Sequence, residues 1–188
     1  MENKLLSYID LCELINRGVI TNVDKSKVNS SSIDVTLGKK ILVEHKFLGG
    51  MKKISLKERT PLVMDSFTFG DSFIDLPVFD LMPGEFILAN TEQEFNLPNN
   101  ISAEYKLKSS LARIGLEHMN AGWCDAGWHG SVLTLEFKNM TNHHVIELRQ
   151  GDPIGQVIFF KHAEVPAHAS YKNRGRYNND KEVKGIKL

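Results

Sequence analysis

The chain has 188 residues, and its 23 Lys and Arg residues balance its 23 Asp and Glu residues, so its formal net charge is zero. This length suits a single domain spanning residues 1–188, and the balanced charge excludes a chain-wide attraction to nucleic acid or to an anionic membrane. Two distant cysteines, Cys12 and Cys124, form no CxxC pair. They argue against a disulfide framework and predict a cytoplasmic protein.

The first predicted element is a helix over residues 5–15. Its apolar residues recur at the spacing of one helical face, and Gly18 follows as a stop signal. Charged residues interrupt residues 1–20, which excludes a signal peptide or a membrane span there. The pattern then alternates, which predicts strands over residues 32–38 and 40–43. Residues 47–79 are polar and irregular, and we expect them to form an excursion outside the core.

The remaining predicted elements are short strands separated by Gly and Pro turns. They cover residues 85–89, 101–105, 132–137, 145–148 and 154–160. Many short strands with such turns indicate a mainly β fold, an antiparallel sandwich or barrel. The tail after Ala169 is basic, Gly-punctuated and poor in apolar residues. It is either a flexible end, which its composition favours, or a lid over an anionic ligand.

Two hydroxyls and two cations lie close together in residues 108–113 (KSSLAR). Donors at the start of a helical turn can orient a phosphate chain while Lys108 and Arg113 neutralise its charge. The alternative is a surface helix capped by Ser110, with both cations in solvent. The spacing leaves both interpretations open.

Two carboxylates are candidates for chemistry. If Leu135 and Phe137 point into the core, Glu136 faces the opposite side, where water would leave it ordinary and a pocket would suit it to proton transfer. Asp125 lies in a Gly- and Trp-rich loop, residues 121–128 (AGWCDAGW). Its glycines permit close backbone approach, and its tryptophans offer flat faces for a base or sugar. A plain β-hairpin fits this loop equally well.

The seven histidines form no metal motif. His162 and Glu164 are spaced like the H-x-E of the zinc nucleobase deaminases, but the P-C-x-x-C that those enzymes also need is missing. We therefore expect no zinc.

Several segments resemble motifs of the dCTP deaminase family, the trimeric relatives of dUTPase. The resemblance is carried by residues 31–38 (SSIDVTLG), 83–89 (PGEFILA), 108–113 (KSSLAR), 133–136 (LTLE) and 153–156 (PIGQ). It covers most of the chain and is weakest over residues 47–79. It implies a mainly β, dUTPase-like β-clip, a distorted antiparallel barrel or sandwich. An N-terminal helix and a mobile C-terminal tail, with residues from about 170 to 188 as a lid, complete the expected fold.

The resemblance also implies a reaction, the hydrolytic deamination of dCTP to dUTP and ammonia. Glu136 would be the acid/base that takes a proton from water so that hydroxide attacks C4 of cytosine. Arg113 and Ser109 would position the water and the pyrimidine edge. The implied substrate-binding residues are Lys108, Ser110, Ala121, Trp123, Thr134, Tyr171 and Arg176. Mg²⁺ would arrive with the triphosphate rather than on protein ligands, and the family norm is a homotrimer with sites at the subunit boundaries.

How far the reaction goes depends on the loop at Ala121-Gly122-Trp123. Deamination-only members usually carry Ala-His-Arg there, whereas bifunctional members that form dUMP show Gly. The chain therefore favours the bifunctional type, with Asp125 orienting a second water towards the α-phosphate, although deamination-only members keep that aspartate.

The chain also departs from the family pattern. The loop over residues 116–122 is one residue shorter than usual, the stretch over residues 130–136 is one residue longer, and Asp180 replaces a common Gln. Two alternatives remain: a dUTP diphosphatase without deaminase activity, and a non-catalytic nucleotide-sensing protein.

Overall fold

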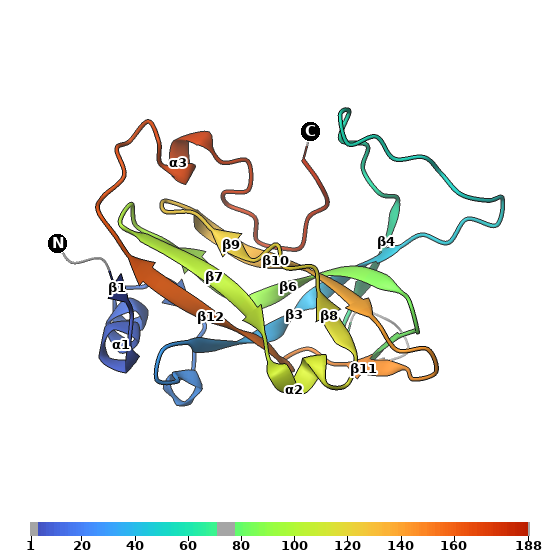
Figure 1. The fold of residues 1–188 in the computed structure, drawn as a ribbon, viewed down its shortest axis with the longest axis horizontal. Coiled ribbons are helices and arrows are strands. Elements are labelled where there is room, and N and C mark those ends of the chain that lie inside the picture. Colours follow the sequence, from blue (N-terminus) through green and yellow to red (C-terminus); the bar gives the residue numbers. More distant parts are fainter. Residues whose placement is uncertain (1–3, 71–77, 188) are drawn as a thin grey trace.

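A computed structural model describes residues 4–70 and 78–187 (Figure 1). The strands are β1 (Lys4–Leu5), β2 (Ile20–Thr21), β3 (Ile33–Glu44), β4 (Met64–Thr68), β5 (Phe79–Leu81), β6 (Phe86–Asn96), β7 (Ile101–Leu107), β8 (Leu116–His118), β9 (Trp123–Cys124), β10 (His129–Asn139), β11 (Ile146–Leu148) and β12 (Pro153–Lys161). The helices are α1 (Tyr8–Asn16), α2 (Ser109–Ala112) and α3 (Tyr171–Arg174), with a 3₁₀ turn, η1 (Lys25–Lys27).

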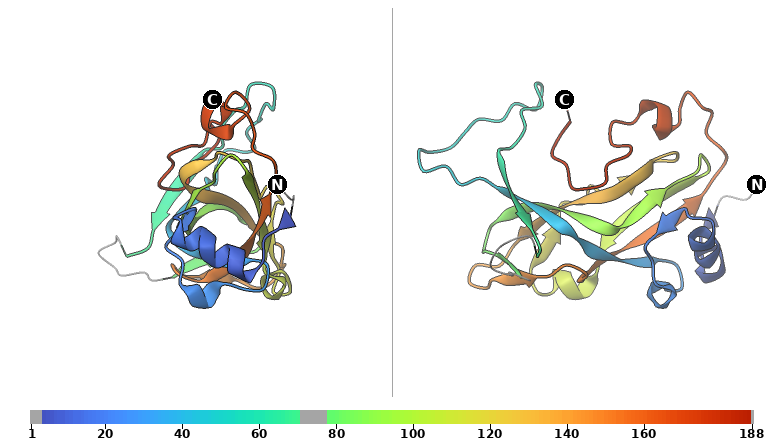
Figure 2. Two further views of the ribbon diagram at one scale, coloured as in Figure 1. Left: turned by 90° about the vertical axis from the view of Figure 1, so that its left-hand side faces the viewer. Right: turned by 180° about the vertical axis from the view of Figure 1, so that it is seen from behind.

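One curled antiparallel sheet makes up most of the fold, which confirms the predicted mainly β class. Its main path runs β8-β10-β6-β3-β12-β7-β9, and a small second sheet pairs β11 with β5. Strand β3 belongs to both halves, because it pairs with β6 and with β12. The two views of Figure 2 show the sheet wrapping around an interior. Among the described residues, no helix is long and apolar enough to cross a membrane.

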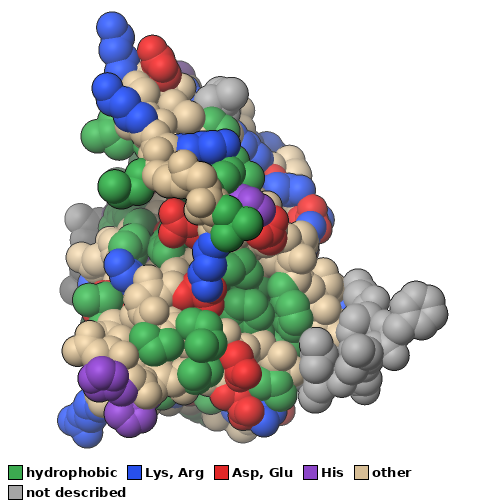
Figure 3. All heavy atoms as spheres, turned by 90° about the vertical axis from the view of Figure 1, so that its right-hand side faces the viewer, with side chains coloured by type: hydrophobic (Ala, Val, Ile, Leu, Met, Phe, Trp, Pro, Cys, Tyr) green, Lys and Arg blue, Asp and Glu red, His purple; other side chains and the backbone are tan. Residues whose placement is uncertain are grey.

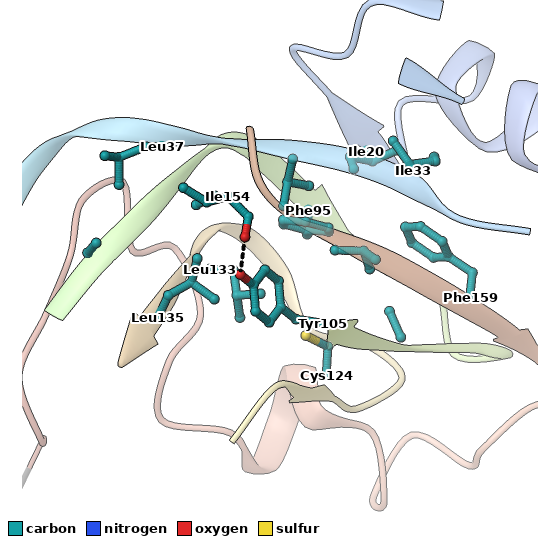
Figure 4. Close-up of a cluster of buried hydrophobic side chains, with 14 of the residues drawn as sticks. Ile20, Ile33, Leu37, Phe95, Tyr105, Cys124, Leu133, Leu135, Ile154 and Phe159 are labelled. Atoms are coloured by element: carbon teal, nitrogen blue, oxygen red, sulfur yellow. Dashed lines mark hydrogen bonds between the residues drawn. The ribbon is translucent and has the colours of Figure 1, made fainter. Parts of the chain in front are cut away.

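The core fills the inside of this curled sheet. Its largest fully buried side chains include Tyr105, Phe95, Phe137 and Phe159. The Tyr105 hydroxyl donates a hydrogen bond of 2.8 Å to the backbone oxygen of Ile154, so this buried polar group is satisfied (Figure 4). The alternating buried positions on β10 and β12 are those of a half-buried antiparallel strand.

The N-terminal helix begins later than predicted, at Tyr8 rather than at residue 5. The backbone N–H of Ser7 donates to the Asp10 carboxylate at 3.1 Å, which is half of a capping box. Leu5 instead lies in β1, opposite Phe160. Gly18 has a φ of +69° and follows the helix, as predicted for a stop signal.

Two segments that were predicted as separate strands form one continuous strand. Residues 32–38 and 40–43 join in β3, where the register with β6 shifts between Leu37 and Ile41. A Cβ at Gly38 would lie 2.2 Å from the Asn90 side chain. The glycine therefore allows a close approach of the two strands rather than ending β3.

The predicted excursion over residues 47–79 contains more regular structure than expected. Strand β4 lies within residues 47–79 and pairs with β3 as an edge strand, and β5 begins at the last residue of this range. Residues 45–63 extend from this hairpin as an arm (Figure 1). Residues 71–77 of the predicted excursion lie outside the described residues. Strands β8 and β9 were also missed, because three and two residues are too few to show a period.

The tail is folded back along β10, with its α3 helix and C-terminal residues on the upper side of the view in Figure 1. The Trp128 indole donates to the backbone oxygen of Tyr177 at 2.6 Å, and the Val132 N–H donates to that of Asp180 at 2.8 Å. Val183 is buried, and Lys40 forms an ion pair of 2.9 Å with Glu182. Composition favoured a flexible end, but these long-range contacts hold the tail on the barrel.

Candidate active site

A cavity of about 580 Å³ lies between β10, the β9 loop, the arm and the tail. Apolar side chains from the arm and from β6, such as Leu62 and Leu88, form much of its wall. Six residues predicted to act on or bind substrate line it: Ala121, Trp123, Asp125, Thr134, Glu136 and Tyr171. On the face shown in Figure 3, charged side chains of both signs are interspersed among hydrophobic ones.

Glu136 lies on the wall of this cavity, which is one of the two surroundings that its place in the strand left open. Leu135 and Phe137 are buried in the core, so Glu136 points the other way, with 28% of its side chain exposed. It pairs with Leu88 of β6. Its Oε2 atom lies 3.5 Å from Nε2 of His118. Sequence reasoning gave His118 no role, because its position beside Glu136 depends on the pairing of β8 with β10.

Asp125 lies at the cavity edge and is oriented by its own loop. The Trp123 indole N–H donates to its Oδ1 at 2.9 Å. Trp123 is 57% exposed, whereas Trp128 is buried and stacks on Phe95 with 5.3 Å between ring centroids. Of the two tryptophans, Trp123 therefore keeps a face for a ligand, and Trp128 is a core residue.

Two neighbouring groups stay in their protonated, neutral forms. Burial, with a smaller contribution from the Asp125 charge, raises the pKa of the Cys124 thiol to about 12. Burial also raises the pKa of the Tyr171 phenol, so this residue presents a hydroxyl to the cavity. Neither group is a base at neutral pH, which leaves the cavity carboxylates as the proton acceptors.

The predicted phosphate element does not line this cavity within the described chain. Helix α2, with Ser109 and Ser110, lies on the opposite side of the barrel from the tail in the views of Figures 1 and 2. Both hydroxyls are exposed, and Lys108 forms an ion pair with Asp34. The exposed Arg113 guanidinium makes no ion pair with a described residue.

One proposed cap is wrong. Helix α2 starts after Lys108, which occupies the N-cap position without a side-chain hydrogen bond. Ser110 lies inside the turn and caps nothing. Both serine hydroxyls are therefore left without a hydrogen-bond partner among the described residues.

Arg176 also lies outside the cavity wall. Its Nη1 donates to the backbone oxygen of Lys187 at 3.5 Å, and its side chain is exposed. The structure thus brings together six of the eleven predicted site residues and separates Lys108, Ser109, Ser110, Arg113 and Arg176 from them.

The cavity carries more negative than positive charge. Asp125, Glu136 and Asp180 line it together with one cation, Lys184. Lys184 forms an ion pair of 2.7 Å with Glu182, and Asp180 is paired with Lys187 at 2.6 Å. Among the described residues, no group of three His, Cys, Asp or Glu side chains could hold a metal ion.

A family model described as dCTP deaminase-like matches residues 5–162. The chain belongs to the dCTP deaminase-like family. Its matched span contains β10, the β9 loop and α2, and therefore both groups of predicted site residues up to Glu136.

Curated members of this family show the same likeness. Proteins named "dCTP deaminase, dUMP-forming" are 35% identical over 166 residues in a Hydrogenobaculum species and 34% identical over 182 residues in Aquifex aeolicus. These alignments cover 88% and 95% of this chain, and 84% and 92% of those proteins. A third, from Methanospirillum hungatei, is 36% identical over 65% of this chain and 66% of its own length.

A solved structure shares the fold. The crystal structure of 2′-deoxycytidine 5′-triphosphate deaminase from Agrobacterium tumefaciens matches with a TM-score of 0.65 and 22% sequence identity. The match covers 86% of this chain and 49% of that one, so the chain spans about half the length of the Agrobacterium protein.

Proposed function

We propose that this protein deaminates dCTP hydrolytically and carries the product on to dUMP. In the first step dCTP and water give dUTP and ammonia, and in the second dUTP and water give dUMP and diphosphate. The observation that carries the proposal is Glu136, a half-buried carboxylate held on a cavity wall by two core neighbours. The similarity to dUMP-forming relatives over most of the chain supports it.

Glu136 supplies the proton transfers of the first step. Its carboxylate takes a proton from water, and the resulting hydroxide attacks C4 of the cytosine. The protonated carboxyl then delivers that proton to N3, and a second transfer from the attacking oxygen to the amino group lets ammonia leave. The apolar wall around Leu88 excludes bulk water and strengthens these interactions.

Asp125 serves the second step. Its carboxylate is oriented by the Trp123 indole and faces the same cavity as Glu136. It accepts a hydrogen bond from a second water and directs that water to the α-phosphate, where diphosphate leaves. Ala121, Trp123 and Thr134 surround the nucleoside, and Tyr171 donates from the tail.

The phosphate chain needs cations that one copy does not place in its cavity. Among the described residues that line the cavity, Lys184 is the single cation beside three carboxylates. In the turn that follows Lys108, the exposed Ser109, Ser110 and Arg113 offer free donors of the kind that bind phosphate, while Lys108 is paired with Asp34. We place this turn in the cavity of a neighbouring copy, within a cyclic homotrimer. Mg²⁺ arrives as part of the nucleotide substrate, which this cytoplasmic enzyme meets in solution.

Replacing Glu136 by Gln tests the acid/base role, because the amide keeps the shape and cannot accept the proton. The variant should bind dCTP with wild-type affinity, measured by calorimetry. Its deamination rate should fall by about 100-fold or more. Deamination at the wild-type rate would refute the mechanism. Parallel loss of binding would point to a structural role instead.

A further inference from the structure

A buried histidine faces the proposed acid/base. Nε2 of His118 and Oε2 of Glu136 lie 3.5 Å apart, and both atoms are buried without a hydrogen-bond partner among the described residues. Unpaired buried polar atoms are rare because each loses its hydrogen bonds to water. Here the two unpaired atoms lie next to each other, a little beyond the usual N–H···O hydrogen-bond range of about 2.7–3.2 Å.

The imidazole is held in this position from several sides. His118 is 5% exposed, and its ring packs edge-on against Tyr105, with centroids 4.6 Å apart. Phe137 lies against it at 5.8 Å, and the same residue pairs with His118 across β8 and β10. The Met119 N–H donates to the backbone oxygen of Glu136 at 3.2 Å. The backbones of both partners are therefore fixed relative to each other, while the carboxylate can still rotate.

We propose that His118 is a positioning residue for deamination. Its Nε2–H donates to Oε2 of Glu136 and orients the carboxylate so that Oε1 faces the water and the base. This inference rests on the proposed function of Glu136. The bond shortens when the substrate is bound, as catalytic hydrogen bonds commonly do relative to the free protein. A neutral imidazole suffices for this donation, and its other nitrogen carries no proton.

A hydrogen bond from His118 would let the carboxylate transfer protons while it keeps its orientation. Oε2 stays bound to His118 throughout, while Oε1 accepts the proton from water and returns it to N3. Leu88 on β6 lies opposite Glu136 and offers no competing donor. Without the imidazole N–H, both carboxylate oxygens are free to rotate, and fewer encounters place Oε1 on the water.

Two substitutions separate positioning from packing. His118→Phe keeps an aromatic ring against Tyr105 and removes the donor, whereas His118→Gln keeps an N–H at similar reach. We expect kcat for dCTP deamination to fall roughly 10- to 100-fold in His118→Phe, the value of one hydrogen bond to a charged group. KM should stay unchanged, and His118→Gln should recover most of kcat.

Leu116→Val is the matched control, because Leu116 is buried in the same strand and has no polar contact with Glu136. It should leave kcat at the wild-type value. A His118→Phe enzyme with wild-type kcat, or a His118→Gln enzyme as slow as His118→Phe, would overturn the positioning role.

A second measurement does not depend on catalysis. In ¹⁵N-edited spectra of the histidine side chains, the His118 proton should reside on Nε2, and its resonance should move in Glu136→Gln. A proton on Nδ1 alone, or an unmoved resonance, would overturn the inference whatever the enzyme does with dCTP. Conversely, a wild-type protein that shows this signature but leaves dCTP intact would refute the proposed function and not the hydrogen bond.

Discussion

Mixing two inactive variants tests whether each site is shared between copies. Glu136→Gln removes the acid/base from the cavity, and Arg113→Ala removes the cation from the exposed turn on the other side of the barrel. If the cavity of one copy receives the turn of the next, a mixed trimer can rebuild an intact site from one defective copy of each kind. Each variant alone should be inactive.

The expected recovery follows from counting. In randomly mixed trimers at equal amounts, half of the cavities and half of the turns are intact. About one quarter of the sites then combine an intact cavity with an intact turn, so about a quarter of the wild-type rate should return. The two variants carry different tags, are exchanged by unfolding and refolding together, and are assayed for deamination of dCTP.

The control mixes Glu136→Gln with the double variant Glu136→Gln/Arg113→Ala, which cannot rebuild a site in any arrangement. It should remain inactive. No recovery in the first mixture, with exchange verified by tag capture, would refute the shared site. Substantial activity of Arg113→Ala alone would refute the role of the turn.

Three further predictions concern the second step, the tail and the core. Asp125→Asn should still deaminate dCTP but accumulate dUTP, visible by chromatography, whereas dUMP formed at an unchanged rate would remove Asp125 from the reaction. Hydrogen bonds from Lys184 and Lys40 lower the pKa of Glu182 from 4.5 to about 2. Only the part from Lys40 joins the tail to the barrel, and this contribution is complete above about pH 4.5 and is lost as the pH falls towards 2. Limited pepsin digestion should release the tail of the wild-type protein over that pH range, and should release the tail of Lys40→Gln at higher pH. Release at the same pH in both proteins would contradict a role of the Lys40–Glu182 ion pair in holding the tail. Tyr105→Phe removes the hydrogen bond of the hydroxyl to the buried backbone oxygen of Ile154 and should lower the free energy of unfolding in urea by about 0.5–1.5 kcal/mol, so an unchanged midpoint would contradict that assignment.

Local pattern was sufficient for the elements that form the barrel wall. Alternation in β10 placed Leu135 and Phe137 in the core and therefore Glu136 on the other face, as the structure confirms. Gly18 marked the end of α1 for a local reason, its positive φ. These predictions succeeded because each depends on neighbours in the chain.

Features that depend on contacts between distant residues could not be predicted from local sequence pattern. The tail looked flexible by composition, yet the Trp128 indole and the Val132 N–H hold its backbone. The sequence pattern gave no reason to assign His118 a role, because its partner Glu136 lies on another strand. The resemblance grouped Arg113 with Glu136, whereas the fold of one copy separates them. Such relations become visible once strand order and register are known.

Product analysis of dCTP hydrolysis tests the central claim most directly. Purified protein is incubated with dCTP and Mg²⁺, and dCTP, dUTP and dUMP are separated by chromatography over time. We predict that dUMP appears directly with little free dUTP, and that Glu136→Gln forms neither product. No conversion of dCTP by the wild-type protein, with dUTP hydrolysed under the same conditions, would contradict the proposed deamination and identify a dUTP diphosphatase instead.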